Sequence, residues 1–232
     1  NIRDKQVPEI TKNRIMASVP FGGRYRLIDF VLSNMTNSGI IKTGIITRYN
    51  YQNMMDHIGT GKAWDLARKR GGIRVLQPYV DEFEEFVPMD NRLETLKGIM
   101  SYLDKSEEEY VVLSDCDVIC NISYSDVLKQ HQKNGADITI VYKKNDKDNH
   151  WKDKRISLKV DENNRVTKIK KARTTKKGTP IYIGTMVVGK EILKNHILIA
   201  CNKGYKSLHQ YWADHTSDMN ILLVYLKICD DA

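Results

Sequence analysis

Helix-like and strand-like patterns of apolar residues alternate along the first 140 residues of the chain. Residues 24–38 carry apolar side chains three and four positions apart, which predicts an amphipathic helix that ends at Gly39. Residues 40–47 and 110–114 are short, continuous apolar runs, as expected of strands buried on both faces. Further helices are predicted at 51–58, 91–105 and 125–134, and further strands at 72–79, 137–143, 155–160, 165–170 and 221–228, with a turn at 161–164.

This alternation defines the expected fold class. Strands that alternate with helices imply right-handed βαβ crossovers, so we expect an α/β fold with a mostly parallel sheet flanked by helices. Ligands of such sheets bind beyond the carboxyl ends of the strands, which directs attention to the residues after Thr47 and Ser114. No internal repeat or linker-like stretch interrupts the sequence, so residues 1–232 are interpreted as one domain.

Charge and composition narrow the functional classes. The 232 residues carry 37 Lys and Arg against 29 Asp and Glu, a formal charge of +8, and residues 143–177 alone hold 14 basic and 5 acidic residues. Few aromatic residues accompany this segment, which favours a solvated, Lys-rich hairpin over a nucleic-acid interface. No apolar run has the length of a membrane span and no secretory signal begins the chain, so we expect a cytoplasmic protein whose four cysteines are reduced. Because the chain does not begin with Met, it is expected to be a fragment.

The most specific sequence block spans residues 19–47. It contains Val-Pro-Phe-Gly-Gly-Arg-Tyr-Arg-Leu-Ile-Asp-Phe at 19–30, Leu-Ser-Asn at 32–34, Asn-Ser-Gly-Ile at 37–40 and Gly-Ile-Ile-Thr at 44–47. This block resembles the glucose-1-phosphate adenylyltransferase family of bacterial glycogen synthesis. The resemblance implies a Rossmann-like nucleotidyltransferase domain with a mixed sheet. In the family a Gly-rich strand and loop precede this block and a left-handed β-helix follows the domain, and we expect both to be missing from this chain.

The family reaction joins the AMP part of ATP to glucose 1-phosphate and releases pyrophosphate. Such chemistry needs cations and Mg²⁺ to neutralise charge on the reacting phosphates, and carboxylates to hold the metal. By resemblance, the family's phosphate-binding lysine corresponds to Met16, and the small residues of its nucleotide and sugar site correspond to residues 91–95. A thioether does not pair with a phosphate, and the larger residues at 91–95 should fill space that a substrate would use.

The resemblance also implies positions for the metal and the sugar phosphate. The family's metal-binding aspartate follows its central strand, and either Asp115 or Asp117 corresponds to it as a vestigial metal ligand. The competing interpretation is that these acids only shape the loop that leaves the strand. The Glu-Lys pair for the sugar phosphate falls near Lys171 and Ala172, and Lys203 stands where the second metal-binding aspartate is expected. A lysine at that position would repel Mg²⁺.

Two arginines in the 19–47 block are candidates for another role. Arg24 and Arg26 follow a Gly-Gly pair at the expected start of a helix. A helix N-terminus offers free N–H groups and partial positive charge, so these residues are candidates for binding an anion or an effector. The alternative is that they are ordinary basic residues of the surface.

This chain keeps the helix and turn that build the family's fold but lacks the side chains that do its chemistry. In this it resembles the non-catalytic regulatory subunit that some Gram-positive bacteria pair with a catalytic adenylyltransferase. We therefore expect no catalytic residue and no required cofactor in this chain, with Mg²⁺ held by the catalytic partner. The implied partner is the catalytic subunit, in a heterotetramer, and binding of a nucleotide or sugar phosphate is left open. The alternative function is an active sugar-1-phosphate nucleotidyltransferase.

Overall fold

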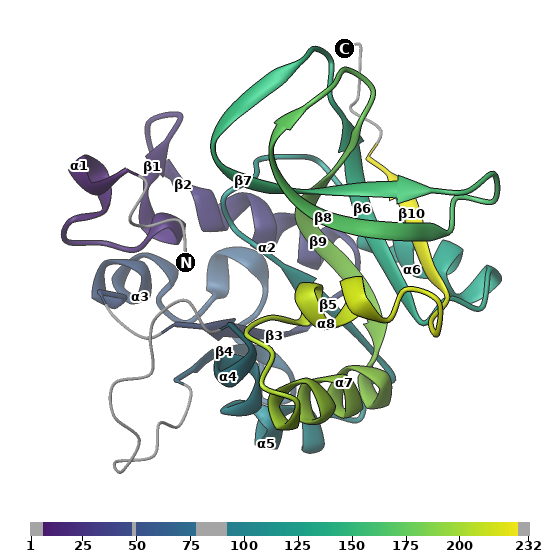
Figure 1. Cartoon of the computed structure of the whole chain (residues 1–232). Helices are drawn as coiled ribbons and strands as arrows, with labels where there is room; N and C mark the ends of the chain where they lie inside the picture. The colour runs from purple at the N-terminus through teal and green to yellow at the C-terminus, as the bar shows by residue number, and fades with distance from the viewer. Residues whose placement is uncertain (1–6, 48–49, 78–91, 227–232) are drawn as a thin grey trace.

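The computed structural model describes residues 7–47, 50–77 and 92–226, and its centre is a six-stranded mixed sheet (Figure 1). The strand order is β10-β6-β9-β7-β8, and β5 also pairs with β9. β9 runs antiparallel to β5, β6 and β7, whereas β6 and β10 are parallel. The strands of this sheet are β5 (Tyr110–Ser114), β6 (Ile138–Lys144), β7 (Asn149–Val160), β8 (Val166–Thr175), β9 (Pro180–Gly189) and β10 (Ile221–Tyr225).

Two smaller strand pairs lie outside the main sheet. β3 (Lys42–Ile46) and β4 (Gly72–Leu76) form a parallel pair. β1 (Pro20–Phe21) and β2 (Tyr25–Arg26) form a short antiparallel hairpin just before the first long helix.

Helices cover both faces of the main sheet. One face packs against α4, α5, α7 and α8, and the other packs against α6. The alternation of side chains along β6 supplies both cores, because Ile138 and Ile140 join the first and Val141 joins the second. A third core lies between α2, α3 and the turns around them. The helices are α1 (Pro8–Thr11), α2 (Leu27–Asn37), α3 (Gln52–Ile58), α4 (Arg92–Lys97), α5 (Met100–Asp104), α6 (Tyr124–Lys133), α7 (Lys190–Asn202) and α8 (Leu208–Asp214), with 3₁₀ turns at Met16–Ser18 and Lys62–Trp64.

The structure confirms the α/β class and the mixed sheet flanked by helices. Parallel pairs are fewer than the sequence predicts, because among the described residues only β6–β10 and β3–β4 pair in this way. β9 lies between β5 and β6 and reverses the direction at both contacts. β7 and β8 form an antiparallel hairpin closed by the predicted turn at 161–164, where Asn164 has a φ of 59°.

Two predicted helices have different bounds in the structure. The helix expected from residue 24 begins at Leu27, because Tyr25 is still extended and pairs with Phe21 across a turn at Gly22 and Gly23. The helix expected at 91–105 is divided into α4 and α5, with a break at Gly98 and Ile99. Residues 78–79, 91 and 227–228, which belong to other predicted elements, lie outside the described residues.

Sequence reasoning assigned no element to β9, α7 or α8. β9 is the most connected strand of the sheet, since β6 pairs with one edge and β5 and β7 pair with the other. Within the described residues, no helix is both long enough and apolar enough to cross a membrane. Cys116, Cys120 and Cys201 are free thiols, as predicted, and Cys229 lies outside the described residues.

Candidate functional site

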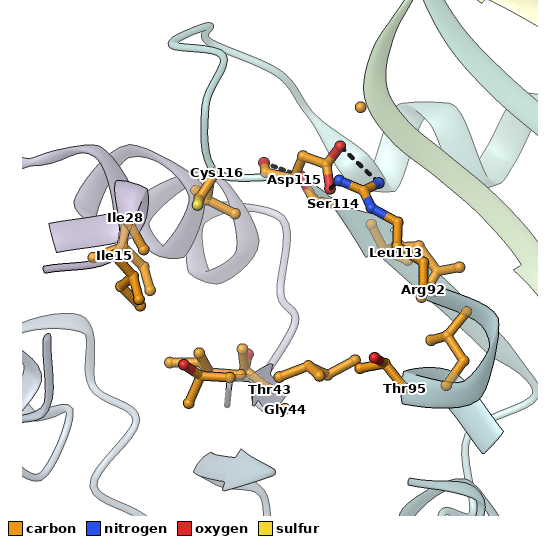
Figure 2. A pocket seen from close by; sticks show the side chains of 18 of the residues that line it. Ile15, Ile28, Thr43, Gly44, Arg92, Thr95, Leu113, Ser114, Asp115 and Cys116 are labelled. Carbon is orange, nitrogen blue, oxygen red and sulfur yellow. Dashed lines mark hydrogen bonds and ion pairs between the residues drawn. The ribbon is translucent and has the colours of Figure 1, made fainter. Parts of the chain in front are cut away.

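A cavity of about 400 Å³ lies between β3, of the small parallel pair, and β5, of the main sheet (Figure 2). Residues 43–47 and residues 112–116 contribute to its wall, together with apolar side chains of α2 and residues of α4 and α8. Within the described part of the chain, β3 pairs only with β4 and β5 pairs only with β9, so each strand has a free edge. The free edges of β3 and β5 therefore border the cavity, and most of the other side chains that line it are apolar.

An ion pair between Arg92 and Asp115 lines this cavity. Arg92 Nη1 lies 3.2 Å from Asp115 Oδ2, and Arg92 Nη2 lies 3.2 Å from Asp115 Oδ1 (Figure 2). Burial lowers the pKa of the Arg92 guanidinium, but the charge and the hydrogen bond of Asp115 outweigh burial and raise this pKa above its ordinary value. Both carboxylate oxygens are thus engaged by one planar guanidinium, the geometry that makes such pairs strong and specific.

Gly184 of β9 allows Asp115 to lie against the sheet. The Asp115 N–H donates to the Gly184 carbonyl oxygen at 2.8 Å, which extends the β5–β9 ladder by one residue. A Cβ atom on Gly184 would lie 2.8 Å from the Asp115 Cβ and 3.1 Å from Oδ2, and Gly184 has a φ of +92°. The position of Asp115 therefore requires glycine on the neighbouring strand.

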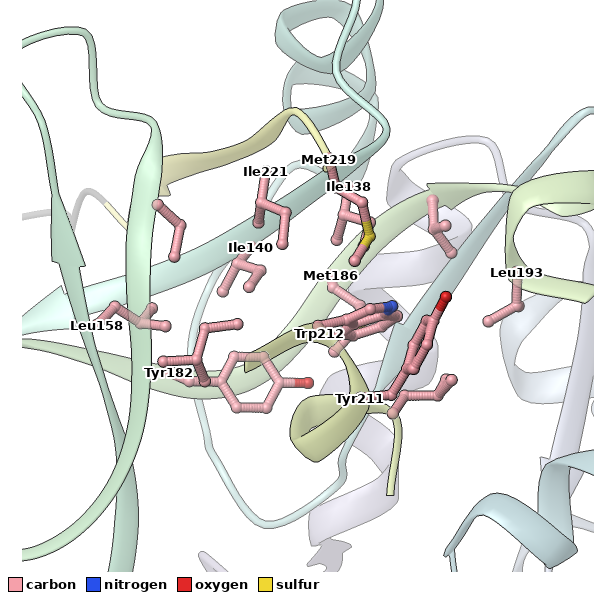
Figure 3. Packing of buried hydrophobic residues seen from close by; sticks show 14 of the residues in the cluster. Ile138, Ile140, Leu158, Tyr182, Met186, Leu193, Tyr211, Trp212, Met219 and Ile221 are labelled. Atoms are coloured by element: carbon pink, nitrogen blue, oxygen red, sulfur yellow. The ribbon is translucent and has the colours of Figure 1, made fainter. Parts of the chain in front are cut away.

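His209 of α8 forms the wall beside this ion pair. Its ring lies 4.9 Å from the Tyr182 ring and 5.7 Å from the Trp212 ring, measured between centroids, and both residues belong to the main core (Figure 3). The His209 Nε2 atom is buried and has no hydrogen-bond partner in the described part of the chain. Burial, assisted by the positive charges of Arg92 and Lys171, lowers the pKa of His209 to about 3. The imidazole is therefore neutral at physiological pH.

Hydroxyl groups surround the end of β5. Ser114 Oγ lies 3.2 Å from Tyr124 OH and 3.2 Å from Thr185 Oγ1. Burial raises the pKa of the Tyr124 phenol, so this group is also neutral. Of the described residues that line the cavity, Asp115 is the single carboxylate, and it is already paired with Arg92.

The polar residues of the 19–47 block hold the scaffold together. Asn34 Nδ2 donates to the Cys120 carbonyl oxygen at 2.7 Å, and Ser38 Oγ accepts the Tyr124 N–H at 2.8 Å. These two contacts fasten α2 to the loop that follows β5. Asp29 accepts the Arg26 N–H at 3.0 Å and lies 2.7 Å from His57 Nε2, which fastens α2 to α3.

The two arginines predicted to bind an anion lie on the surface, away from the cavity wall. Arg24 is exposed, and its Nη2 donates to the Tyr25 hydroxyl at 3.0 Å while its guanidinium lies over the Tyr25 ring. Arg26 donates through Nη1 to the Asn53 carbonyl oxygen. Asp29 already supplies a carboxylate at the start of α2. An anion-binding role for Arg24 and Arg26 stays a prediction.

The other positions inferred from the resemblance are separated in the structure. Arg92 and Thr95 line the cavity, so the segment at 91–95 lies at the site, although Asn91 is outside the described residues. Met16 is buried in its 3₁₀ turn and does not line the cavity. Lys171 and Lys203 are exposed, and neither lines the cavity.

The donor set at this site does not fit Mg²⁺. Asp115 is paired with a cation of the chain itself, and Asp117 does not line the cavity. Over residues 7–47, 50–77 and 92–226, no group of three or more His, Cys, Asp and Glu residues could hold a metal ion. Mg²⁺ prefers an octahedral set of oxygen ligands. A vestigial metal role for Asp115 or Asp117 stays a prediction.

Sequence reasoning missed Arg92 and His209 as residues of the site. For Arg92 a signal existed, because a basic residue stood in a segment that the resemblance placed beside the candidate metal ligand. His209 lies in α8, to which the sequence pattern assigned no element. Its approach to Arg92 depends on the packing of α8 against the core, which no local pattern reveals.

Comparison with known proteins agrees with this fold. A family model described as nucleotidyl transferase matches residues 5–170, so the chain belongs to the nucleotidyl transferase family. The chain is 40% identical over 139 residues to the glycogen biosynthesis protein GlgD of Bacillus subtilis (strain 168), a match that covers 58% of this chain and 38% of that protein. It is 41% identical over 132 residues to GlgD of Geobacillus stearothermophilus, covering 57% of this chain and 38% of that protein.

Catalytic relatives match equally well. The chain is 40% identical over 132 residues to the glucose-1-phosphate adenylyltransferase of Clostridium kluyveri, covering 57% of this chain and 34% of that protein. The chain thus spans well under half the length of the curated relatives it matches. The resemblance inferred from the 19–47 block is confirmed.

Proposed function

We propose that this chain belongs to a regulatory subunit of glucose-1-phosphate adenylyltransferase in bacterial glycogen biosynthesis and has little or no catalytic activity of its own. The similarity to the two GlgD proteins supports the link to glycogen biosynthesis. The similarity to the adenylyltransferase supports a common fold with the enzyme that makes ADP-glucose and pyrophosphate from ATP and glucose 1-phosphate.

The observation that carries this proposal is the Arg92–Asp115 ion pair. Transfer of a nucleotidyl group needs a carboxylate free to hold a metal and cations free to face the phosphates. Among the described residues that line the cavity, the one carboxylate and one of the arginines neutralise each other. Met16, which resemblance places at the phosphate-binding lysine, is buried and carries no charge.

The proposed partner is the catalytic adenylyltransferase subunit, in a heterotetramer in which Mg²⁺ serves the catalytic chain. A fold that retains its scaffold contacts offers a surface for assembly even when its own site is inert. We place this assembly in the cytoplasm, where the free thiols of Cys116, Cys120 and Cys201 would remain reduced.

The proposal is tested by assaying the purified full-length protein alone with ATP, glucose 1-phosphate and Mg²⁺. Loss of one charge-stabilising donor costs roughly a hundredfold or more in rate, so we expect a rate at least about a hundredfold below that of the catalytic subunit prepared in the same way. A comparable turnover would contradict the proposal.

The second candidate is an active sugar-1-phosphate nucleotidyltransferase. It is favoured by the 40% identity to the adenylyltransferase of Clostridium kluyveri, which equals the identity to GlgD of Bacillus subtilis. The same protein sample, offered other nucleoside triphosphates and sugar 1-phosphates, distinguishes this candidate, because it predicts release of pyrophosphate with at least one pair.

A further inference from the structure

We infer that the cavity holds a β-strand in the full-length protein: an extended, apolar segment from outside residues 1–232 that pairs with β3 along one edge and with β5 along the other. The inference concerns how the sheet is completed, so it goes beyond the proposed function. Its test measures backbone hydrogen bonds, and the outcome does not depend on whether the protein is regulatory or catalytic.

Backbone groups on the free edge of β5 face the cavity. The Asp115 N–H donates to the Gly184 carbonyl oxygen, so Asp115 and every second residue before it bond to β9. In an antiparallel pair the residues between them point their N–H and C=O groups the other way. These residues include Val112 and Ser114, and both line the cavity. Each therefore presents an N–H and a C=O group to the cavity.

The free edge of β3 has the same character. The Thr47 N–H donates to the Leu76 carbonyl oxygen at 3.1 Å, so Thr47 and every second residue before it bond to β4. The residues between them point their backbone groups away from β4. These residues include Gly44 and Ile46, which line the cavity. Figure 2 shows Gly44 and Ser114 on separate sides of the cavity, so the two free edges border it from two sides.

The other walls continue the two cores that cover the main sheet. Leu113 packs against the main core, to which Leu96 and Trp212 of the cavity wall also contribute. Val112 packs against the core on the opposite face, together with Met35 of α2. Successive side chains of a strand point to opposite faces of a sheet. A strand in the cavity would therefore add its side chains alternately to these two cores.

An extended polypeptide is the occupant that matches both features. Backbone N–H and C=O groups in apolar surroundings cost free energy unless they are hydrogen-bonded. A strand carries such groups along both edges, at the spacing of its neighbours, and presents side chains to both faces. A small apolar ligand would leave the backbone groups of β3 and β5 without partners, and a small polar ligand would face the apolar walls.

The composition of the chain indicates where the strand comes from. A strand that is buried on both faces needs a continuous apolar run, such as Tyr-Val-Val-Leu at 110–113. Residues 1–6, 48–49, 78–91 and 227–232 contain no more than two consecutive apolar residues. The match to GlgD of Bacillus subtilis covers 38% of that protein, so this relative has ample chain beyond the matched region. The strand therefore belongs to the remainder of the full-length protein.

Amide hydrogen exchange in the full-length protein tests the pairing, with residue resolution from fragmentation of the labelled peptides in the mass spectrometer. The cavity-facing amides are those of Gly44, Ile46, Val112 and Ser114, and the amide of Leu113, which faces β9, is the internal standard. Amides bonded within a sheet exchange only when the sheet opens, so we expect protection of the cavity-facing amides within about tenfold of that of Leu113. Protection that is lower than this would overturn the inference.

The source of the strand is tested by a cryo-electron microscopy structure of the full-length protein. We expect continuous main-chain density between β3 and β5 that traces to the same polypeptide, outside residues 1–232. A small molecule or solvent in this place, or a strand from a second chain, would overturn the inference. Neither measurement involves ATP, glucose 1-phosphate or a catalytic subunit, so failure of this inference leaves the proposed function to its own assay.

Discussion

Gly184 and Asp115 are in direct contact across β9 and β5, and the contact leaves no room for a side chain on Gly184. A Cβ atom there would come within 2.8 Å of the Asp115 Cβ. The carboxylate that follows β5 is therefore positioned by the absence of an atom on the neighbouring strand. The Arg92 contact then depends on this position.

Replacing Gly184 by alanine should destabilise the protein through this contact. The φ of +92° and the close approach to Asp115 both oppose a Cβ atom. The matched control is Gly178→Ala, because Gly178 has a φ of +79° but no heavy atom within 4 Å of the added Cβ. The control isolates the cost of the backbone conformation, which is about 1–2 kcal/mol.

We expect Gly184→Ala to cost a further 1–3 kcal/mol or so in the free energy of unfolding, as typical for an overpacked position. Denaturant unfolding of the two variants measures the difference. Equal losses in both would mean that Asp115 moves aside freely and that its position is not set by Gly184.

His209 should make the protein less stable as the pH falls below neutrality. The ordinary histidine pKa is 6.5 and burial lowers that of His209 to about 3, so the unfolded chain binds a proton that the folded chain rejects. The stabilisation is present above pH 6.5 or so, is lost progressively between there and about pH 3, and changes no further below that. At pH 5 the loss is about 2 kcal/mol.

The measurement is the free energy of unfolding at pH 7 and pH 5 for the wild type and His209→Gln. Burial also lowers the pKa values of His131 and His196, which contribute in the same direction in both proteins. His150→Gln serves as the control because His150 is exposed. We expect His209→Gln to reduce the pH dependence and His150→Gln to leave it unchanged. An unchanged dependence in His209→Gln would mean that the pKa of His209 is not lowered in the folded protein.

The sequence predicts much of the scaffold because its patterns are local. The apolar spacing of α2, the continuous apolar run of β5 and the turn at 161–164 each express a preference that tertiary contacts reinforce. The prediction fails where a turn or a break interrupts an apolar pattern that would otherwise continue. Tyr25 is extended because it pairs with Phe21, and α4 ends before α5 because the chain breaks at Gly98.

For the site, the sequence identifies individual segments but not the contacts between them. The resemblance places either Asp115 or Asp117, after a predicted strand, and the segment at 91–95 at the site. The pairing of Asp115 with this segment depends on how α4 packs through Leu93, and the neutral state of His209 depends on the burial of α8 against the main core. Both are consequences of packing between segments that are far apart in the sequence.

Asn34→Ala should loosen the contact between α2 and the loop after β5. Asn34 is buried, and its Nδ2 donates to the Cys120 carbonyl oxygen at 2.7 Å. Removing the donor leaves that carbonyl without this partner, which costs about 1–3 kcal/mol in the free energy of unfolding. Asn134→Ala is the control, because Asn134 is exposed and its 2.9 Å contact to Gln130 lies at the end of α6.

Denaturant unfolding of the two asparagine variants provides the comparison. The control should change the free energy of unfolding by no more than about 0.5 kcal/mol. If Asn34→Ala is equally mild, the Leu-Ser-Asn motif is not retained for this scaffold contact.

The central claim is that the protein acts on a catalytic adenylyltransferase subunit and does not act as an enzyme itself. The most direct test is to measure the saturation kinetics of the catalytic subunit, alone and co-expressed with the full-length protein. We predict that the two chains elute together and that the affinity for a substrate or effector changes by roughly 5- to 150-fold, which corresponds to about 1–3 kcal/mol of coupling. Separate elution with unchanged kinetic constants would contradict the account.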